Sequence, residues 1–374
     1  MKITVLSHNL SSNAVMRAHR LAVAARQFAE VTLLGPLERS GPWPALPAES
    51  WIKSVEERRL PKFYQFFLEL VAQADGDVLL AVKPQFASFG AALVAAERRG
   101  VPVILDFDDW DLAFTPRSQW EADPLIADPQ RPASAVYVSL LTKARHAAAA
   151  ITVASTALQQ KVGGVLVPHG SLVEFFDPAR TDRDAARQEF GFKGPTVLFA
   201  GTPRRHKGVL ELAQAVDRLP GVTLAVTCRP HDLLEPEWQG RSLLKIPLLP
   251  YAAMPRLLAA ADVVVVPQLE TDAGGFQMPM KVYDYMAMGK PIVASQISDL
   301  PTVLDGCGRL VPPGDVDQLS QAIQSLLACP EEAHALGQRA RNRCLERFSM
   351  QRIGQILLDV VKAIPAQPSE RSAS

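Results

Sequence analysis

Residues 279–295 read PMKVYDYMAMGKPIVAS, and this stretch predicts the type of fold. Its first part has the composition of a helix, Gly289 is placed to cap that helix, and Pro291 prevents its continuation. The apolar run that follows is typical of a strand buried on both faces. A helix followed at once by a buried strand is the repeating unit of a parallel α/β sheet.

The same alternation extends in both directions from this stretch and restarts once along the chain. Strands are expected at residues 2–6, 31–34, 78–82, 101–105, 151–153 and 165–167, and again at 196–199, 222–226, 243–246, 263–266, 291–294 and 309–311. Segments of helical period, such as 14–28 and 209–219, separate most of them. The sequence therefore predicts the α/β class, with two Rossmann-like doubly wound domains facing across a ligand-binding cleft.

Composition excludes several classes of protein. The 374 residues include 39 Lys plus Arg and 39 Asp plus Glu, a balance that argues against a nucleic-acid binder. The amino terminus lacks a signal-peptide pattern and no run approaches the roughly 20 apolar residues of a membrane span, so we expect a cytoplasmic protein. The four cysteines form no C-x-x-C pair and the seven histidines are scattered, so no zinc site is expected.

Two further motifs place polar residues after strands in the second half. Residues 198–208, LFAGTPRRHKG, predict a strand, a cationic turn and the start of a helix. Backbone N–H groups favour an anion there, and Lys207 with Arg204 or Arg205 would add positive charge. The stretch VPPGD ends at Asp315, which is expected to cap the next helix.

The order, spacing and strand contexts of these three motifs resemble glycosyltransferase family 4, whose members have two Rossmann-like domains in the GT-B architecture. The resemblance covers roughly residues 165–360 well and the first half in layout. It implies a retaining glycosyltransferase of hexosyltransferase type in glycan, polysaccharide or glycolipid biosynthesis. Such an enzyme moves a sugar from a nucleotide diphosphate sugar to the hydroxyl of a sugar, glycan or lipid-linked acceptor, without a cofactor or a metal.

The resemblance also assigns a role to each segment of the chain. Residues 1–170 form an acceptor-side domain, and residues 171–347 form the domain that binds the nucleotide sugar. A helix at 348–364 crosses back to the first domain, and the polar tail 365–374 is disordered.

The family's donor-site roles transfer to matching positions. Lys207 and Arg205 become catalytic cations that stabilise the departing diphosphate, and Arg204 contributes to donor binding. Thr202 replaces an arginine that many relatives carry, so either of the two arginines could supply the second cation. Asp284 replaces a glutamate that accepts hydrogen bonds from the ribose hydroxyls.

The loop before that helix carries the remaining donor candidates. Gly274 and Gly275 could offer backbone N–H groups to a phosphate or sugar oxygen. Lys281, near the start of the helix, could add charge to the diphosphate site. The family's other glutamate aligns with Phe276, which cannot replace it. Glu270 or Asp272, in the preceding loop, could do so.

Residues 101–111, VPVILDFDDWD, carry four carboxylates at the expected carboxyl end of a strand. This is the edge at which α/β sheets bind ligands, and four mutually repelling acids favour a functional interpretation. Asp108 or Asp109 is expected to hydrogen-bond the attacking acceptor hydroxyl. A metal site of the D-x-D type at Asp106 and Asp108 is the alternative.

Residues 51–72 mix basic and aromatic side chains, a composition that could contact a membrane surface or a lipid-linked acceptor. Acids in the same stretch favour core packing instead, so peripheral contact with the inner face of a membrane stays open.

Two other functions also stay open: a nucleotide-sugar epimerase of similar architecture and a catalytically silent partner protein that binds sugar nucleotides. Turnover of a nucleotide sugar with and without acceptors separates them from a transferase. A dehydrogenase is not expected, because no G-x-G-x-x-G follows a strand.

Overall fold

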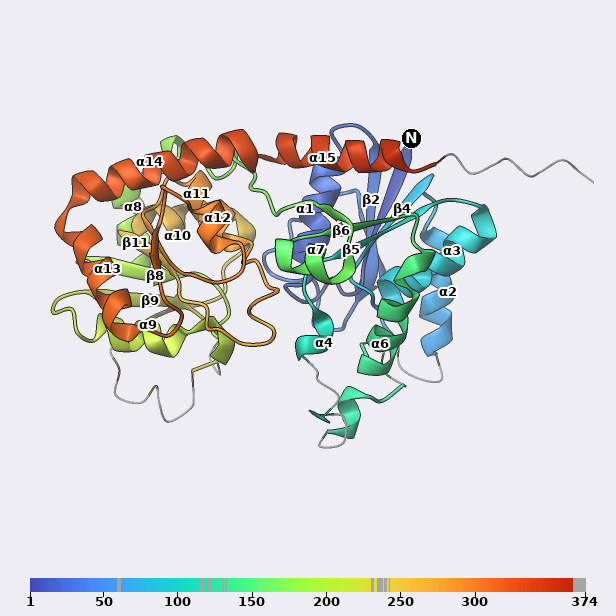
Figure 1. Ribbon diagram of the computed structural model, residues 1–374, viewed down its shortest axis with the longest axis horizontal. Helices are drawn as coiled ribbons and strands as arrows, with labels where there is room; N and C mark the ends of the chain where they lie inside the picture. Colours follow the sequence, from blue (N-terminus) through green and yellow to red (C-terminus); the bar gives the residue numbers. More distant parts are fainter. Residues whose placement is uncertain are drawn as a thin grey trace, which may run out of the picture. The chain divides into compact units, whose positions relative to one another are not determined.

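A computed structural model describes residues 1–58, 62–114, 118, 119, 123–129, 131, 133–229, 232, 233, 238, 241 and 243–365. Internal contacts divide the chain into two units. Unit 1 comprises Met1–Pro168 and the chain from Gln351 onward, and unit 2 comprises His169–Met350 (Figure 1). The α/β class with two parallel sheets is confirmed. Most of the polar tail predicted to be disordered lies outside the described residues.

Unit 1 contains a parallel sheet of seven described strands in the order β3-β2-β1-β4-β5-β6-β7. These strands are β1 (Lys2–Ser7), β2 (Glu30–Leu37), β3 (Ile52–Glu56), β4 (Val78–Val82), β5 (Val103–Phe107), β6 (Ala150–Val153) and β7 (Val165–Leu166). The chain adds strands on one side of β1 and then returns to add them on the other. The gap between the carboxyl ends of β1 and β4 is therefore the topological switch point, where such sheets bind ligands.

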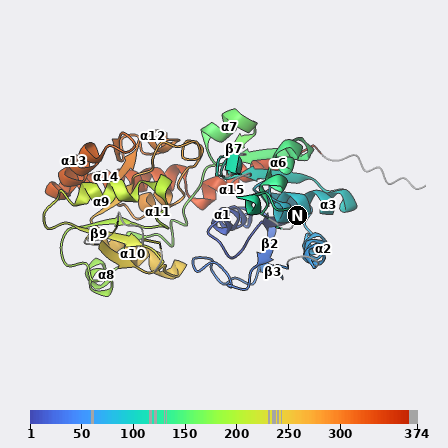
Figure 2. The same cartoon turned by 90° about the horizontal axis from the view of Figure 1, so that it is seen from below.

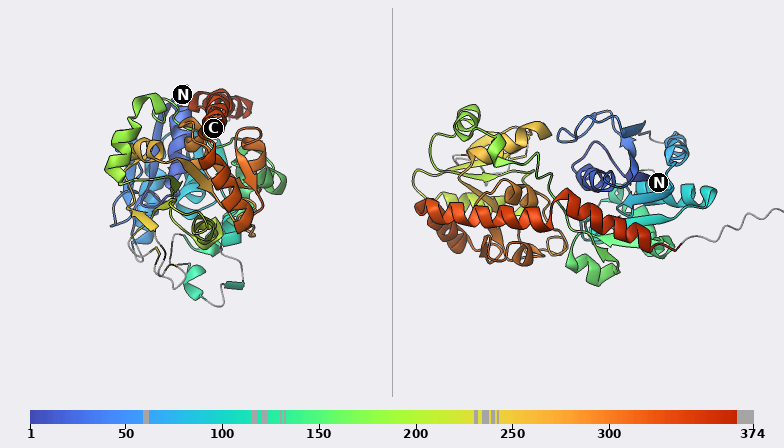
Figure 3. Two further views of the ribbon diagram at one scale, coloured as in Figure 1. Left: turned by 90° about the vertical axis from the view of Figure 1, so that its left-hand side faces the viewer. Right: turned by 90° about the horizontal axis from the view of Figure 1, so that it is seen from above.

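Helices and short helical turns connect these strands. They are α1 (Val15–Ala25), α2 (Phe63–Gln73), a π-helical turn (Phe86–Gly90), α3 (Ala91–Arg99), α4 (Asp111–Phe114), a 3-10 turn (Pro124–Ile126), α6 (Ala135–Lys143), a second 3-10 turn (Ala144–Ala147), α7 (Thr156–Val162) and the last helix, α15 (Met350–Ala363). Gly354 lets α15 lie against α1 (Figure 3, right), since an added Cβ would stand 2.8 Å from the Ala24 carbonyl oxygen.

Unit 2 contains a parallel sheet of six described strands in the order β10-β9-β8-β11-β12-β13. These strands are β8 (Thr196–Phe199), β9 (Thr223–Thr227), β10 (Leu243–Ile246), β11 (Val263–Val266), β12 (Ile292–Ser295) and β13 (Arg309–Val311). β8 and β11 are entirely buried, as expected for central strands with helices on both faces.

The helices of unit 2 pack in pairs, α8 with α10 and α9 with α13 (Figure 2). The described helices and turns are a 3-10 turn (Pro178–Arg180), α8 (Arg183–Phe190), η5 (Arg205–Lys207), α9 (Val209–Val216), a 3-10 turn (Tyr251–Ala253), α10 (Met254–Ala260), α11 (Lys281–Ala287), α12 (Leu300–Val303), α13 (Val316–Ala328) and α14 (Pro330–Arg347).

The stretch that predicted the fold forms α11 and β12. Gly289 lies between them in the left-handed region at φ +61°, which a glycine adopts without strain. The cap at Asp315 is also confirmed, because its carboxylate accepts the backbone N–H of Gln318 at 2.9 Å.

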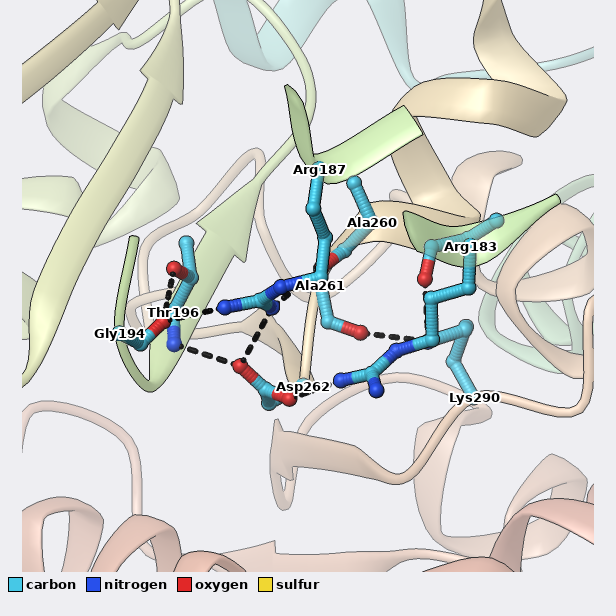
Figure 4. Close-up of polar contacts among 9 residues, drawn as sticks. Arg183, Arg187, Gly194, Thr196, Ala260, Ala261, Asp262 and Lys290 are labelled. Carbon is cyan, nitrogen blue, oxygen red and sulfur yellow. Dashed lines mark hydrogen bonds and ion pairs between the residues drawn. The ribbon is translucent and has the colours of Figure 1, made fainter. Parts of the chain in front are cut away.

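At the amino-terminal edge of the unit 2 sheet, charged side chains form hydrogen bonds and ion pairs with neighbouring groups of the protein (Figure 4). Asp262, just before β11, accepts the backbone N–H of Thr196 at 2.8 Å, binds Arg187 at 3.1 Å and pairs with Arg183. Lys290 donates to two carbonyl oxygens at the end of α10. These charged groups have partners from the protein itself, so this edge is a structural network.

Candidate functional site

The opposite, carboxyl-terminal edge of the unit 2 sheet places a cation beside a glycine. Lys281, the first residue of α11, directs its ammonium over the ring of Phe199, with Nζ 3.4 Å from the ring centroid. An added Cβ at Gly201 would stand 3.2 Å from Nζ, so the glycine leaves the space that the ammonium occupies. Nζ is buried and makes no hydrogen bond with any described residue.

The neighbouring turn brings Lys207 to the same place. Burial lowers the pKa of Lys281 well below its usual value, and the charge of Lys207 lowers it further, so the two lysines lie within electrostatic reach of each other. Gly208 ends the turn at φ +64°, and an added Cβ would collide with the Pro267 carbonyl. The turn therefore requires glycine to start α9 at this position.

α11 is fixed to the end of β8 by Tyr285. The Tyr285 hydroxyl accepts the backbone N–H of Ala200 at 3.1 Å and lies 3.3 Å from the Ala200 carbonyl oxygen. Burial raises the pKa of this hydroxyl, so it stays protonated. The contact determines where Lys281, one helical turn earlier, lies relative to Gly201.

The two arginines predicted to provide the second cation are directed elsewhere. Arg205 forms an ion pair with Glu211 on α9 at 2.7 Å, and its side chain is 68% exposed. Arg204 is exposed, and its side chain makes no hydrogen bond or ion pair with the described residues. The cation that the structure brings beside Lys207 is thus Lys281.

Asp284 lies on α11, one turn after Lys281, and accepts the Ser171 hydroxyl at 2.6 Å. The backbone N–H of Ser171 in turn donates to the Phe348 carbonyl oxygen at 2.8 Å. Asp284 therefore stabilises the segment with which unit 2 begins, in addition to any role toward a ligand.

The glycine-rich loop differs from the sequence-based expectation. The Gly274 N–H donates to the Thr271 hydroxyl at 3.0 Å, and the Gly275 N–H donates to the Thr271 carbonyl at 3.1 Å. Both N–H groups are thus used within the loop and are not presented to a donor oxygen. Gly274 is required by packing, because an added Cβ would stand 2.6 Å from the Leu269 carbonyl oxygen.

In unit 1, Asp106 is fully occupied by the protein. Arg17 donates to both carboxylate oxygens at 3.0 and 2.8 Å, and the Thr152 hydroxyl donates at 2.7 Å. The Arg17 and Asp106 side chains are 1% and 0% exposed. This ion pair removes the basis for a metal site at Asp106 and Asp108, and no group of metal-binding side chains occurs among the described residues.

The next acids surround Lys83, which follows β4. Its ammonium lies 2.7 Å from Asp109 and 3.0 Å from Asp111, and only 6% of its side chain is exposed. Burial opposes the charge, yet Asp109, Asp111 and Asp108 together raise the pKa of Lys83 above its usual value. Lys83 thus stays charged and orients Asp109 at the carboxyl edge of the sheet.

Asp108 has a different electrostatic environment from Asp109. Burial, and then the charge of Asp109, raise the pKa of Asp108 to about 7. His8, which follows β1, has its pKa lowered to about 3 by burial and by Lys83, so it is neutral. A carboxyl group that titrates near neutral pH and a neutral imidazole therefore lie at the carboxyl edge of the unit 1 sheet.

Sequence analysis placed the acids at this edge but did not pair them with Lys83 or bring His8 to them. Lys83 follows β4, and His8 follows β1. Because these strands are neighbours on either side of the switch point, their order in the sheet is the signal that could have joined Lys83, His8 and the acids after β5.

Residues 194–329 match the family model Glycosyl transferases group 1. Lys207, Lys281 and Asp284 lie inside this matched region, whereas Asp108 and Asp109 lie outside it.

Three curated relatives are similar over parts of the chain. An MMP alpha-(1->4)-mannosyltransferase from Mycolicibacterium hassiacum is 44% identical over 100 residues, covering 26% of this chain and 23% of that protein. An alpha-maltose-1-phosphate synthase from Mycolicibacterium smegmatis is 28% identical, covering 46% and 49%. A GDP-mannose-dependent monoacylated alpha-(1-6)-phosphatidylinositol monomannoside mannosyltransferase from Corynebacterium glutamicum is 28% identical, covering 53% and 56%. The matches span about half the length of these relatives or less.

Solved structures match nearly the whole chain. Sucrose-phosphate synthase from Thermosynechococcus elongatus superimposes with a TM-score of 0.71 at 18% identity, covering 97% of this chain and 98% of that one. HepE from Anabaena, in complex with UDP and glucose, gives 0.72 at 17% identity, covering 97% and 100%. The two-domain fold expected from the sequence is thereby confirmed. Among the described residues, no helix has the length and apolarity to cross a membrane.

Proposed function

We propose that this protein is a retaining glycosyltransferase of family 4, of hexosyltransferase type, that moves a sugar from a nucleotide diphosphate sugar to an acceptor hydroxyl. One observation carries the proposal. Within the region that matches the glycosyl transferase family model, a buried ammonium without a hydrogen-bond partner among the described residues lies beside a second lysine at the ligand-binding edge.

The donor's diphosphate suits this pair of cations. A departing diphosphate gains negative charge in the transition state, and preorganised cations stabilise that charge more than the charge of the bound donor. Lys207 and Lys281 are the residues we assign to this contact, with Arg204 adding charge from the same turn. Arg205 joins them only by leaving Glu211.

Asp284 is the proposed contact for the donor's ribose. One carboxylate oxygen accepts the Ser171 hydroxyl, and a carboxylate has further lone pairs for a ribose hydroxyl. The Ser171 bond fixes the orientation of the carboxylate before the donor arrives.

Unit 1 is the proposed acceptor side. Lys83 holds Asp109 in a fixed orientation, and the Asp108 carboxyl, with its pKa raised to about 7, can accept a hydrogen bond from the attacking hydroxyl. The resemblance implies a front-side reaction in which the diphosphate takes the hydroxyl proton. Asp108 and Asp109 then orient the acceptor, and no protein base is obligatory.

The acceptor class we propose is a sugar, a glycan or a lipid-linked sugar, with the protein in the cytoplasm and in peripheral contact with a membrane. The named activity of the Corynebacterium relative on a phosphatidylinositol mannoside supports a lipid-linked acceptor. Tyr64 and Leu68 on α2 and Leu140 on α6 are 64%, 48% and 57% exposed, which supports the contact. Arg58 pairs with Glu69 at 3.0 Å, so the charge of this arginine contributes little to it.

The test is a thermal-shift screen with UDP, GDP and ADP and their sugar derivatives, followed by turnover assays with and without acceptors. A ligand at 100 times its dissociation constant should add about 2.7 kcal/mol of stability. Transfer to an acceptor, with the donor's anomeric configuration kept in the product, supports the proposal. Interconversion of the sugar without acceptor would favour an epimerase, and binding without turnover would favour a silent partner protein.

A further inference from the structure

Lys281 is enclosed before any ligand arrives. The face of Phe199 lies 3.4 Å from its Nζ, the backbone at Gly201 closes another side, and no described residue accepts a hydrogen bond from it. A charged ammonium in such a place has lost its water without gaining an anion. Desolvation of that kind favours the neutral amine.

The described residues compensate for this loss only in part. The face of Phe199 gives the ammonium a cation–π contact, which stabilises it by less than the cost of removing water from an unpaired charge. The turn η5 contains Lys207, His206 and Arg205, and the Arg205 side chain is paired with Glu211. Lys207 acts on Lys281 as a like charge.

α11 itself adds two titratable groups near Lys281. The Asp284 carboxylate accepts the Ser171 hydroxyl, and the Tyr285 hydroxyl bonds to the backbone of Ala200. Burial and the charge of Lys207 together lower the pKa of Lys281 well below its usual value.

We propose that Lys281 is uncharged in the free protein and takes up one proton from solvent when the diphosphate of a nucleotide binds beside Lys207. The inference rests on the proposed function, since the ligand it needs is a nucleoside diphosphate or its sugar derivative. The amine nitrogen accepts the proton and becomes an ammonium that donates to a phosphate oxygen. The proton returns to solvent when the nucleotide leaves.

This coupling makes nucleotide affinity depend on pH in a defined direction. Proton and nucleotide favour each other's binding, and linkage makes the effect reciprocal. Below the pKa of Lys281 in the free protein the lysine is already charged, and affinity should not change with pH. Between that pKa and the higher pKa in the complex, affinity should fall about tenfold for each unit of rising pH.

The experiment is calorimetric titration of UDP and of GDP into the whole protein at pH 8, in two buffers of different ionisation enthalpy. At this pH a terminal phosphate with a pKa near 6 is already ionised, so it contributes little proton uptake. The parent should take up about one proton per nucleotide bound, the stoichiometry of one amine becoming one ammonium. Lys281→Met should take up none and should bind more weakly.

Lys193→Met is the matched control. Lys193 is an exposed lysine between α8 and β8. It lies before the amino-terminal end of β8, whereas Lys281 lies near the carboxyl-terminal end of this strand. The same substitution there should leave affinity and proton uptake at parental values.

Three results separate the possible outcomes. Nucleotide binding by the parent without proton uptake, or uptake that persists in Lys281→Met, overturns the inference while leaving the proposed function intact. A folded parent that binds no nucleotide contradicts the proposed function instead. Should Lys281→Met fail to fold, the parent's affinity measured from pH 6 to pH 10 decides, because a constant affinity across that range excludes the coupling.

Discussion

A lysine with a buried ammonium lies at the carboxyl edge of each sheet, but the two ammonium groups differ in whether the protein supplies them with acidic partners. In unit 1, Lys83 lies within 3.0 Å of Asp109 and Asp111, and its charge is balanced by the protein. In unit 2, the Lys281 ammonium has no hydrogen-bond acceptor among the described residues, and the nearby charge of Lys207 acts against its own charge. The protein itself therefore neutralises the buried lysine of unit 1. In unit 2, we propose that an anionic ligand does so.

Lys290 shows that this difference is not a property of buried lysines in unit 2 as such. At the opposite edge of the same sheet its ammonium donates to two carbonyl oxygens (Figure 4). The missing acceptors are specific to the edge at which α/β sheets bind ligands.

The largest effect is expected when the two lysines receive the same substitution. Lys83→Met leaves Asp109 and Asp111 buried without their cation and should cost about 3 kcal/mol, because breaking a buried pair strands the other charge. Lys281→Met removes an amine that has no hydrogen-bond partner among the described residues and should leave stability unchanged or slightly raised. Urea denaturation at pH 8 measures both. If both variants lose the same free energy of unfolding, the two lysines do not differ in how the protein balances their charge.

Asp284→Ala sharpens the comparison within unit 2. Loss of a hydrogen bond between a hydroxyl and a carboxylate is equivalent to about 1.5 kcal/mol, so the donor KM should rise about tenfold with kcat nearly unchanged. Ser171→Ala is the matched control, because it removes the same intramolecular bond but leaves the carboxylate. If both variants raise the donor KM equally, the carboxylate acts through Ser171 and does not contact the ribose.

Asp108→Asn tests the electrostatics of unit 1. The folded-state pKa of Asp108 is about 7, above its ordinary value of 3.8, so the folded protein binds the extra proton between these limits. Stability then falls as pH rises through that window. Asn cannot ionise, so at pH 8 the variant should be more stable than the parent, and at pH 4 the two should be equal. The acceptor KM should rise in the same variant. Equal stability of the two proteins at both pH values would place Asp108 in a more solvated site.

The smallest effect is expected from removal of metal. The cations at the donor edge are lysines, and both oxygens of Asp106 bind Arg17. Dialysis against EDTA should therefore leave most of the transfer rate. A rate that collapses and returns with Mn²⁺ would reverse this assignment.

Local signals in the sequence were sufficient for the fold. The run of helix, Gly289 and strand formed α11 and β12, and Asp315 capped α13, because capping and burial patterns act over a few residues. The edge carrying the acids after β5 was also predictable, since parallel strands bring their carboxyl ends together.

The partners of the charged side chains were not predictable in this way. Arg17 and Asp106 are 89 positions apart, and Lys281 reaches the space at Gly201 from another element. The resemblance left Arg204 or Arg205 as the second cation, but it could not show that a glutamate on the next helix, Glu211, lies 2.7 Å from Arg205. Such pairings depend on tertiary packing, which one sequence does not encode in its spacing.

The most direct test of a donor site in unit 2 is the kinetics of Lys207→Ala over a range of donor concentrations, beside its melting curve. Loss of one preorganised contact to a developing charge typically costs about 10²–10³ in rate. We therefore expect kcat to fall by about that factor while stability stays within about 1 kcal/mol of the parent, as for a change outside the core. Parental kcat in a well-folded Lys207→Ala protein would contradict the assignment of the diphosphate to this edge.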